Sequence, residues 1–250
     1  MIYKYLKSLT LLNTKSISKS RIGICFGLFI ALIMIVLIPE SFSVLGSNQI
    51  YDLDEHIYGK NYSEWGGQWW LFLSNFTSTD VPAGDNTGGR CNDKQIDPNM
   101  FFLFGTFGNQ DKITRECTVP SSKAILVPVL VSECSDLERK SLDTPENRRN
   151  CVYEGTKENV NKLNFSLDGI PLTNVTNYFT EIPLNVTLKG GNAWGVDPGD
   201  AMAHTGGYYV ILKPLSPGKH TIAFDADKSG TGAITIDLEY NLNVINSTNH

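Results

Sequence analysis

Three tryptophans lie within six consecutive residues, and a fourth stands in a glycine-rich stretch. Trp65, Trp69 and Phe72 recur at positions i, i+4 and i+7, which places them on one face of a helix. Exposed indole rings stack on sugar rings, so Trp65 and Trp69 are candidates for a glycan-binding surface. Rings at this spacing more often cover a core. Trp194 is the better stacking candidate, because loops more often carry binding residues.

Acidic side chains offer a second kind of chemistry. Glu64 lies beside a tryptophan, and a carboxyl in an aromatic pocket can act as a general acid. The same residue near a helix start would also favour the helix dipole. Asp197, Asp200 and His204 share a stretch with a Pro-Gly turn, where they suit acid–base chemistry, a metal or plain turn chemistry. These four residues are weak catalytic candidates.

No sequence motif for a serine-nucleophile elbow, a phosphate loop, a zinc-binding helix or a Cys–His nucleophile pair is present. The sequence therefore favours a protein without enzymatic activity.

Asp225, Asp227 and Ser229 alternate with other residues before Gly230, as at the start of a calcium loop. The acidic residue expected later in such a loop is missing, because Ile236 occupies that position. In a β protein, a hairpin turn explains the pattern better than a calcium loop does. Calcium is the one cofactor that the sequence leaves open.

The cysteines indicate an oxidising compartment. Cys25 lies in an apolar segment, and four more follow at positions 91, 117, 134 and 151. An even set of this kind is typical of two disulfides in an exported protein. Four cysteines allow three pairings, and we expect the nearest neighbours to pair, Cys91 with Cys117 and Cys134 with Cys151.

The N-terminal region predicts export. Residues 22–38 carry no charge, and the 21 residues before them hold five basic side chains and no acidic one. This length lies between a signal-peptide core and a membrane span. We favour a signal peptide over a retained anchor; uncleaved, residues 22–38 would hold the chain in the membrane. In both cases the basic flank stays in the cytoplasm. Residues 1–43 are thus a targeting or anchoring segment, and residues 44–250 a single extracytoplasmic domain, secreted or held on the outer side of the cell membrane.

The remainder of the chain is acidic, since it holds all 26 Asp and Glu residues. An acidic surface excludes a nucleic-acid partner, because binding phosphates needs basic side chains. Six Asn-x-Ser/Thr sequons permit glycosylation. They begin at Asn61, Asn75, Asn164, Asn174, Asn185 and Asn246.

The elements that would position these residues are mostly strands. We expect helices over 62–73, with Ser63 as N-cap, and over 145–161, with Thr144 as N-cap. Three hairpins are predicted: 113–119 with 123–131, 163–167 with 170–172, and 208–212 with 220–225. Further strands are expected over 100–107, 184–188 and 233–244, and long loops over 77–98 and 190–207.

This pattern predicts a mainly β protein. The strands suggest an antiparallel β-sandwich or jelly roll with two helical insertions, preceded by an N-terminal apolar helix. Arg115 is expected to pair with a carboxylate across strands. Arg148, Arg149 and Lys157 are expected in solvent.

Two segments resemble a known family. They are the pattern YGxxYxEWxxxWW over residues 58–70 and CTVPxxKA over residues 117–124. In these the chain is similar to a family of exported bacterial and archaeal proteins of unassigned function. It departs from the family at Gly206, where an acidic residue is expected. The resemblance implies a single exported domain with paired cysteines.

Three functions follow as hypotheses. The first is an exported or surface-anchored binding module for a polysaccharide or cell-envelope component. The second is a secreted glycan hydrolase, which needs two carboxylates about 5–10 Å apart in one cleft. The third is an envelope protein that assembles with itself.

Overall fold

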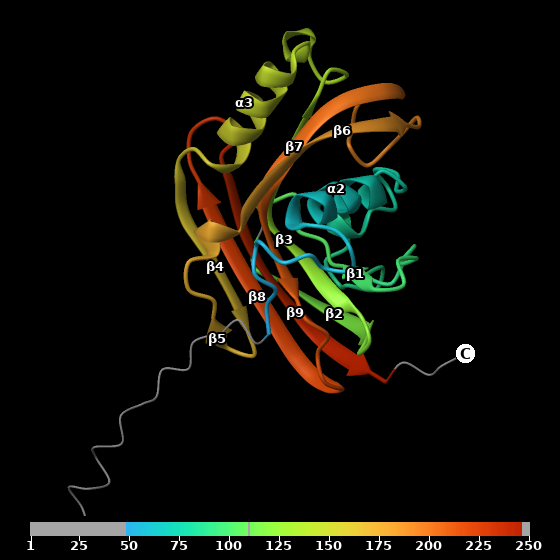
Figure 1. Ribbon diagram of the computed structural model, residues 1–250, viewed down its shortest axis with the longest axis vertical. Coiled ribbons are helices and arrows are strands. Elements are labelled where there is room, and N and C mark those ends of the chain that lie inside the picture. Colours follow the sequence, from blue (N-terminus) through green and yellow to red (C-terminus); the bar gives the residue numbers. More distant parts are fainter. Residues whose placement is uncertain (1–48, 110, 247–250) are drawn as a thin grey trace, which may run out of the picture. The chain divides into compact units, whose positions relative to one another are not determined.

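Two β-sheets form the body of the protein in the computed structural model, which describes residues 49–109 and 111–246 (Figure 1). The strands are β1 (Met100–Phe102), β2 (Ile113–Pro120), β3 (Ala124–Ser135), β4 (Val160–Leu167), β5 (Ile170–Pro171), β6 (Phe179–Leu188), β7 (Gly199–Leu212), β8 (Gly218–Lys228) and β9 (Ile234–Ile245). The helices are α2 (Tyr62–Leu73) and α3 (Pro145–Thr156), with short 3₁₀ turns at Pro82–Gly84, Lys140–Leu142 and Val175–Tyr178.

The predicted N-terminal apolar helix and its role as signal peptide or anchor lie outside the described residues. Within the described residues, no helix is long and apolar enough to span a membrane.

The strand order is β1-β3-β7-β6 in one sheet and β2-β9-β8-β4-β5 in the other. The mainly β prediction with two helices is confirmed. The sheets are mixed rather than purely antiparallel, because β1 pairs with β3 and β2 pairs with β9 in parallel. The parallel pairs arise because β2 and β3, and again β7 and β8, lie in different sheets.

Two of the three predicted hairpins are therefore wrong. The turns after β2 and after β7 carry the chain from one sheet to the other instead of reversing it within a sheet. The third hairpin, β4–β5, is confirmed. Its turn residues Asp168 and Gly169 have φ of 52° and 74°, as a two-residue turn with positive φ at both positions requires.

The main core lies between the two sheets. Alternate residues of β9 point inward, so Leu238, Tyr240 and Leu242 are buried while their neighbours are not. They meet inward side chains of the four-stranded sheet such as Val127 and Val210. The five-stranded sheet is buried at alternate residues, as in a β-sandwich. The strands β3 and β7 of the other sheet are buried on both faces.

Helix α2 covers the other face of the four-stranded sheet (Figure 1). The helix forms because Asn61 caps it: the Asn61 side chain accepts from the Glu64 amide at 2.9 Å, and the Glu64 carboxylate accepts from the Asn61 amide at 2.8 Å. Asn61, rather than Ser63, is thus the N-cap. Trp65, Trp69 and other apolar residues of α2 pack into a second buried cluster against the sheet.

Helix α3 lies against β3 and β7 and is tied to β3 by the disulfide Cys134–Cys151. Thr144 caps it, as expected. The helix ends at Thr156, before the predicted end. Arg148 is buried rather than in solvent, where its Nη1 donates to the Leu142 carbonyl at 2.7 Å.

The second disulfide joins Cys91 to Cys117. Both predicted pairings are confirmed.

Candidate functional site

A pocket of about 280 Å³ opens between α2, the segment after β1 and the loop that joins β6 to β7. Trp69 and Trp70 line it from α2, Thr106 and Phe107 from the segment after β1, and Trp194 from the loop. Glu133 of β3 is the one carboxyl in its lining. We call it the tryptophan pocket.

The ring of Trp70 makes edge-to-face contacts with the rings of both Trp69 and Trp194. The rings of Trp70 and Trp194 lie 5.4 Å apart at 73°, and those of Trp69 and Trp70 lie 5.0 Å apart at 88°. Trp69 Nε1 donates to the Leu103 carbonyl at 2.8 Å, and Trp70 Nε1 donates to the Tyr209 hydroxyl at 2.9 Å. These bonds fix two of the rings in place.

Three residues of the tryptophan pocket carry a buried polar atom that has no hydrogen-bond partner within the described residues. In the described part of the chain, five buried side-chain nitrogen or oxygen atoms lack a hydrogen bond, and three of them belong to pocket residues. They are Thr106 Oγ1, Glu133 Oε2 and Trp194 Nε1. Buried polar atoms are nearly always hydrogen-bonded in native proteins. All three belong to residues that line the pocket, but each of these atoms is itself buried.

Glu133 is a neutral acid at neutral pH. Burial raises its pKa to about 9, and the neighbouring carboxyl of Glu138, which is hydrogen-bonded to it, adds to the effect. A protonated carboxyl can donate a hydrogen bond as well as accept one. Glu64, the sequence candidate for a carboxyl in an aromatic pocket, belongs instead to the cap of α2, and the carboxyl that lines the tryptophan pocket is that of Glu133.

Arg115 supports the pocket from behind. It is 1% exposed and points inward from β2. Its Nη1 donates to the carbonyl of Gly105 at 2.9 Å and to the Tyr240 hydroxyl at 2.8 Å, and its Nη2 donates to the carbonyl of Ala83 at 2.9 Å. Because Ala83 and Gly105 belong to the pocket wall, Arg115 joins two of its segments. The prediction that Arg115 pairs with a carboxylate is wrong, because its guanidinium donates to backbone carbonyls and to a tyrosine hydroxyl instead.

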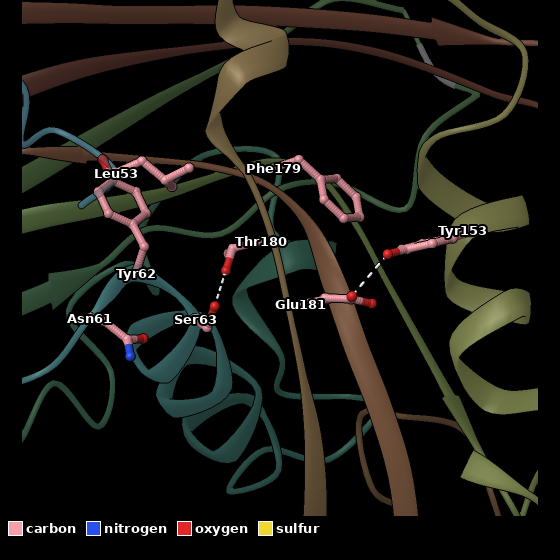
Figure 2. Close-up of a pocket in the computed structure, with 8 residues that line it drawn as sticks. All are labelled: Leu53, Asn61, Tyr62, Ser63, Tyr153, Phe179, Thr180 and Glu181. Atoms are coloured by element: carbon pink, nitrogen blue, oxygen red, sulfur yellow. Dashed lines mark hydrogen bonds between the residues drawn. The ribbon is translucent and has the colours of Figure 1, made fainter. Parts of the chain in front are cut away.

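A second, more open cleft of about 320 Å³ lies between α2, β6 and α3 (Figure 2). Figure 2 shows Tyr153 reaching from α3 toward Glu181 of β6, and the hydroxyls of Ser63 and Thr180 hydrogen-bonded to each other. We call this the polar cleft.

Glu181 is surrounded by donors. Arg149 Nη2 donates to it at 2.6 Å, the Tyr153 hydroxyl at 2.8 Å, and His204 Nε2 lies 2.9 Å from it. Burial alone would raise the pKa of this carboxyl, but the hydrogen bonds from the three donors lower it to about 2. With its oxygens occupied, Glu181 fastens α3 to the sheet and offers little to a ligand.

Acid is expected to weaken the protein through Glu181. Its pKa is lower in the folded chain than the ordinary 4.5, so its contribution to stability is complete above about pH 4.5 and is lost as pH falls toward 2. We expect Glu181→Gln to lower the free energy of unfolding at pH 7 by about 2 kcal/mol. In this variant, the free energy of unfolding should also fall less steeply as the pH is lowered from about 4.5 to about 2. Urea unfolding followed from pH 7 to pH 2 measures both effects.

The matched control for this prediction is Asp200→Asn, which removes an exposed carboxylate that accepts a hydrogen bond from the Thr187 hydroxyl at 2.7 Å. This control should keep the acid response of the wild type. An unchanged response in Glu181→Gln would contradict the role given to Glu181.

The structure separates the candidate binding tryptophans. Trp65 is 1% exposed, and its Nε1 donates to the Ile57 carbonyl at 2.8 Å. It is a core residue and is removed from the binding candidates. Trp69 and Trp194 both line the tryptophan pocket, joined there by Trp70.

The four weak catalytic candidates are not assembled into one site. Glu64 belongs to the cap of α2. Asp200 and His204 lie on β7 rather than in the predicted loop, and His204 contacts Glu181. Asp200 lines a separate shallow depression, and Asp197 is exposed in the loop before β7. None of the four lines the tryptophan pocket.

The predicted calcium residues lie at the end of β8 and in the turn after it. Asp225 pairs with Lys162 at 2.8 Å and accepts from Asn164 at 3.0 Å. Asp227 lies two residues further along the strand, and Ser229 follows it. The pattern is thus a strand end and turn, as the alternative interpretation held.

Over residues 49–109 and 111–246, one group of three His, Cys, Asp or Glu side chains lies within ligand distance of one another. It consists of Cys134, Glu138 and Cys151, and the two sulfurs are joined in a disulfide. The calcium residues have no such group around them.

Sequence reasoning missed Thr106, Glu133 and the support from Arg115. Inward alternation along β2, where Arg115 falls between buried Ile113 and Cys117, is a signal that identifies a buried arginine. Nothing in the local sequence marks Thr106, whose place depends on how the segment after β1 packs.

Comparisons with known proteins add little. No family model matches the chain, and no curated protein matches it. The solution structure of amebosin matches at a TM-score of 0.20 and 12% identity, over 58% of this chain and 99% of that chain. A likeness at this level carries no argument about fold or function.

Proposed function

We propose that the protein is an exported binding module and that the tryptophan pocket holds a sugar ring of a glycan. The observation that carries the proposal is the convergence of three tryptophans, Trp69, Trp70 and Trp194, on one pocket. A sugar ring presents apolar C–H faces that stack on indole rings.

The size of the pocket supports a single ring. Pockets for drug-sized ligands span about 300–1,000 Å³, and this one has about 280 Å³. We infer that one ring at the end or edge of a glycan enters, while the remainder of the glycan stays in solvent.

Export is supported by the two disulfides and by the apolar segment of the sequence. Disulfides form and persist in oxidising compartments outside the cytoplasm. The family resemblance, which implies an exported domain, agrees with this proposal.

Trp194→Ala is expected to weaken glycan binding about tenfold or more, because truncating a tryptophan that anchors a binding surface typically costs about 2 kcal/mol or more. Full-length oxidised protein would be incubated with insoluble polysaccharides and envelope fractions, and its depletion from solution measured. Ile96→Ala is the control, since Ile96 is 87% exposed and lies outside the pocket. Equal depletion of both variants would sink the assignment of the site.

A glycan hydrolase is the second candidate, and Glu133 is the observation that favours it. A carboxyl with a raised pKa beside aromatic rings suits a general acid. Its partner Glu138 is hydrogen-bonded to it, which is closer than the 5–10 Å of glycosidase carboxyl pairs. We therefore prefer binding. Release of soluble sugar from the polysaccharides during the depletion experiment would instead favour the hydrolase.

A further inference from the structure

We propose that Asn185 carries an N-linked glycan and that the first sugar ring of this glycan covers Met202. The inference goes beyond the proposed function, because it concerns a covalent modification of the surface and not the tryptophan pocket. It shares with that function only the premise that the chain is exported.

The fold already uses the side chains of three sequon asparagines. Asn61 caps α2. Asn75 Nδ2 donates to two carbonyls of α2, at 3.0 and 3.2 Å, and Asn164 Nδ2 donates to the Asp225 carboxylate at 3.0 Å. A glycan replaces one hydrogen of this amide nitrogen, so at Asn75 and Asn164 it would compete with bonds that hold the fold. The sequon at Asn246 ends outside the described residues.

The side chains of Asn174 and Asn185 are free. Both residues are exposed, and within the described chain neither side chain has a hydrogen-bond partner. The threonines that complete their sequons, Thr176 and Thr187, are exposed as well. Asn185 and Thr187 are two residues apart on β6 and therefore point to the same face of the sheet. The amide and the hydroxyl of this sequon thus lie side by side on the surface.

Asn185 also has an exposed apolar neighbour. Met202 of β7 is the cross-strand partner of Asn185 and is 50% exposed. Directly opposite residues of antiparallel strands share a face, with Cβ atoms about 4.5–5.5 Å apart. Both side chains line a shallow depression of about 340 Å³. A sugar ring attached to Asn185 would reach this depression and remove the apolar surface of Met202 from water, which is favourable.

The modification is a group transfer from a lipid-linked oligosaccharide, carried out by a membrane-bound transferase of the cell. Nδ2 of Asn185 forms a bond to C1 of the first sugar, while the bond from C1 to the phosphate oxygen of the lipid breaks. The lipid phosphate leaves with the electron pair of that bond, and the amide loses one proton. The protein contributes only the acceptor side chain.

Peptide mapping tests the site. Full-length protein purified from the cells that naturally produce it would be digested, and its peptides analysed by tandem mass spectrometry. We expect sugar on the peptides that contain Asn185 and Asn174, and none on those that contain Asn75 and Asn164. Asn185→Gln, produced in the same cells, should lose one glycan from its intact mass. Asn75→Gln is the matched control and should keep every glycan of the wild type.

Oxidation tests the contact with Met202. Hydrogen peroxide converts accessible methionine to its sulfoxide, which peptide masses report. Because Met202 is 50% exposed in the bare chain, we expect the glycan to slow its oxidation about twofold or more. Asn185→Gln supplies the bare chain for this comparison. Met100 is 0% exposed, so it is the internal control and should resist oxidation in both proteins.

The outcomes separate this inference from the proposed function. An Asn185 without sugar would overturn the inference, as would equal oxidation of Met202 in the two proteins. If the four cysteines of the described chain are then found paired, export stands and the glycan site alone fails; free thiols would contradict export as well. Asn185→Gln should be depleted by polysaccharide like the wild type, because Asn185 lies outside the tryptophan pocket.

Discussion

Replacement of Arg115 by methionine is expected to lower the free energy of unfolding by about 4 kcal/mol, because each buried acceptor left without a donor costs about 1–3 kcal/mol. The guanidinium serves backbone carbonyls of the pocket wall and the Tyr240 hydroxyl. Loss of the desolvated cation offsets part of this cost. The Tyr240 hydroxyl would keep its own bond to the Phe104 carbonyl, at 2.8 Å.

The same substitution is expected to abolish glycan binding, since the carbonyls of Ala83 and Gly105 would no longer be held together. Urea unfolding measures the stability, and depletion by polysaccharide measures the binding at a temperature where circular dichroism shows the variant folded.

The matched control is Arg148→Met, which removes the other buried arginine of the described chain, outside the tryptophan pocket. Arg148 donates to the Leu142 carbonyl, so its loss should destabilise less and leave binding intact. An Arg115→Met protein that folds and still binds like the wild type would contradict the supporting role of Arg115.

Removal of the disulfide between Cys91 and Cys117 is the second large effect. The two residues are 26 apart in sequence, and the loop-closure model gives about 3.5 kcal/mol for a loop of this size. Both cysteines are buried, so we expect the double serine variant to lose that amount or more. Denaturant unfolding of the variant against the wild type, both without reductant, provides the measurement.

The second disulfide supplies the comparison. Cys134 and Cys151 are 17 apart, so the same model predicts a slightly smaller loss for their double serine variant, about 3 kcal/mol. A loss below about 1 kcal/mol for the first variant would show that residual structure in the unfolded chain already closes this loop.

Much of the local structure follows from the sequence. The i, i+4, i+7 spacing of Trp65, Trp69 and Phe72 predicts α2 despite two glycines in the helix. Those glycines face the sheet: a Cβ on Gly66 would lie 3.2 Å from the ring of Tyr209. The alternation of apolar and polar residues predicts β9. The order of the cysteines along the chain predicts both disulfides.

The sheet topology does not follow in the same way. A short turn such as residues 121–123 reverses a strand within one sheet or carries it to the facing sheet with the same local residues. The choice is made by long-range pairing, here of β2 with β9 and of β3 with β7. Local patterns therefore predict the strands but not their partners.

The lining of the tryptophan pocket follows only in part from the sequence. Residue type and setting single out Trp69 and Trp194, whereas the place of Glu133 depends on segments that are distant in the chain. The pKa of Glu133 is raised mainly by burial in the folded protein, so the residues next to it in the sequence cannot predict the shift.

The placement of β9 governs the order in which the fold can form. This strand lies between β2 and β8 in the five-stranded sheet, and its parallel register joins Ile113 to Leu238. Pairing across so long a stretch of chain is slow, because the ends of a large loop must meet before any contact rewards them. The five-stranded sheet therefore lacks its link between β2 and β8 until β9 has been synthesised, whereas the four-stranded sheet does not depend on β9.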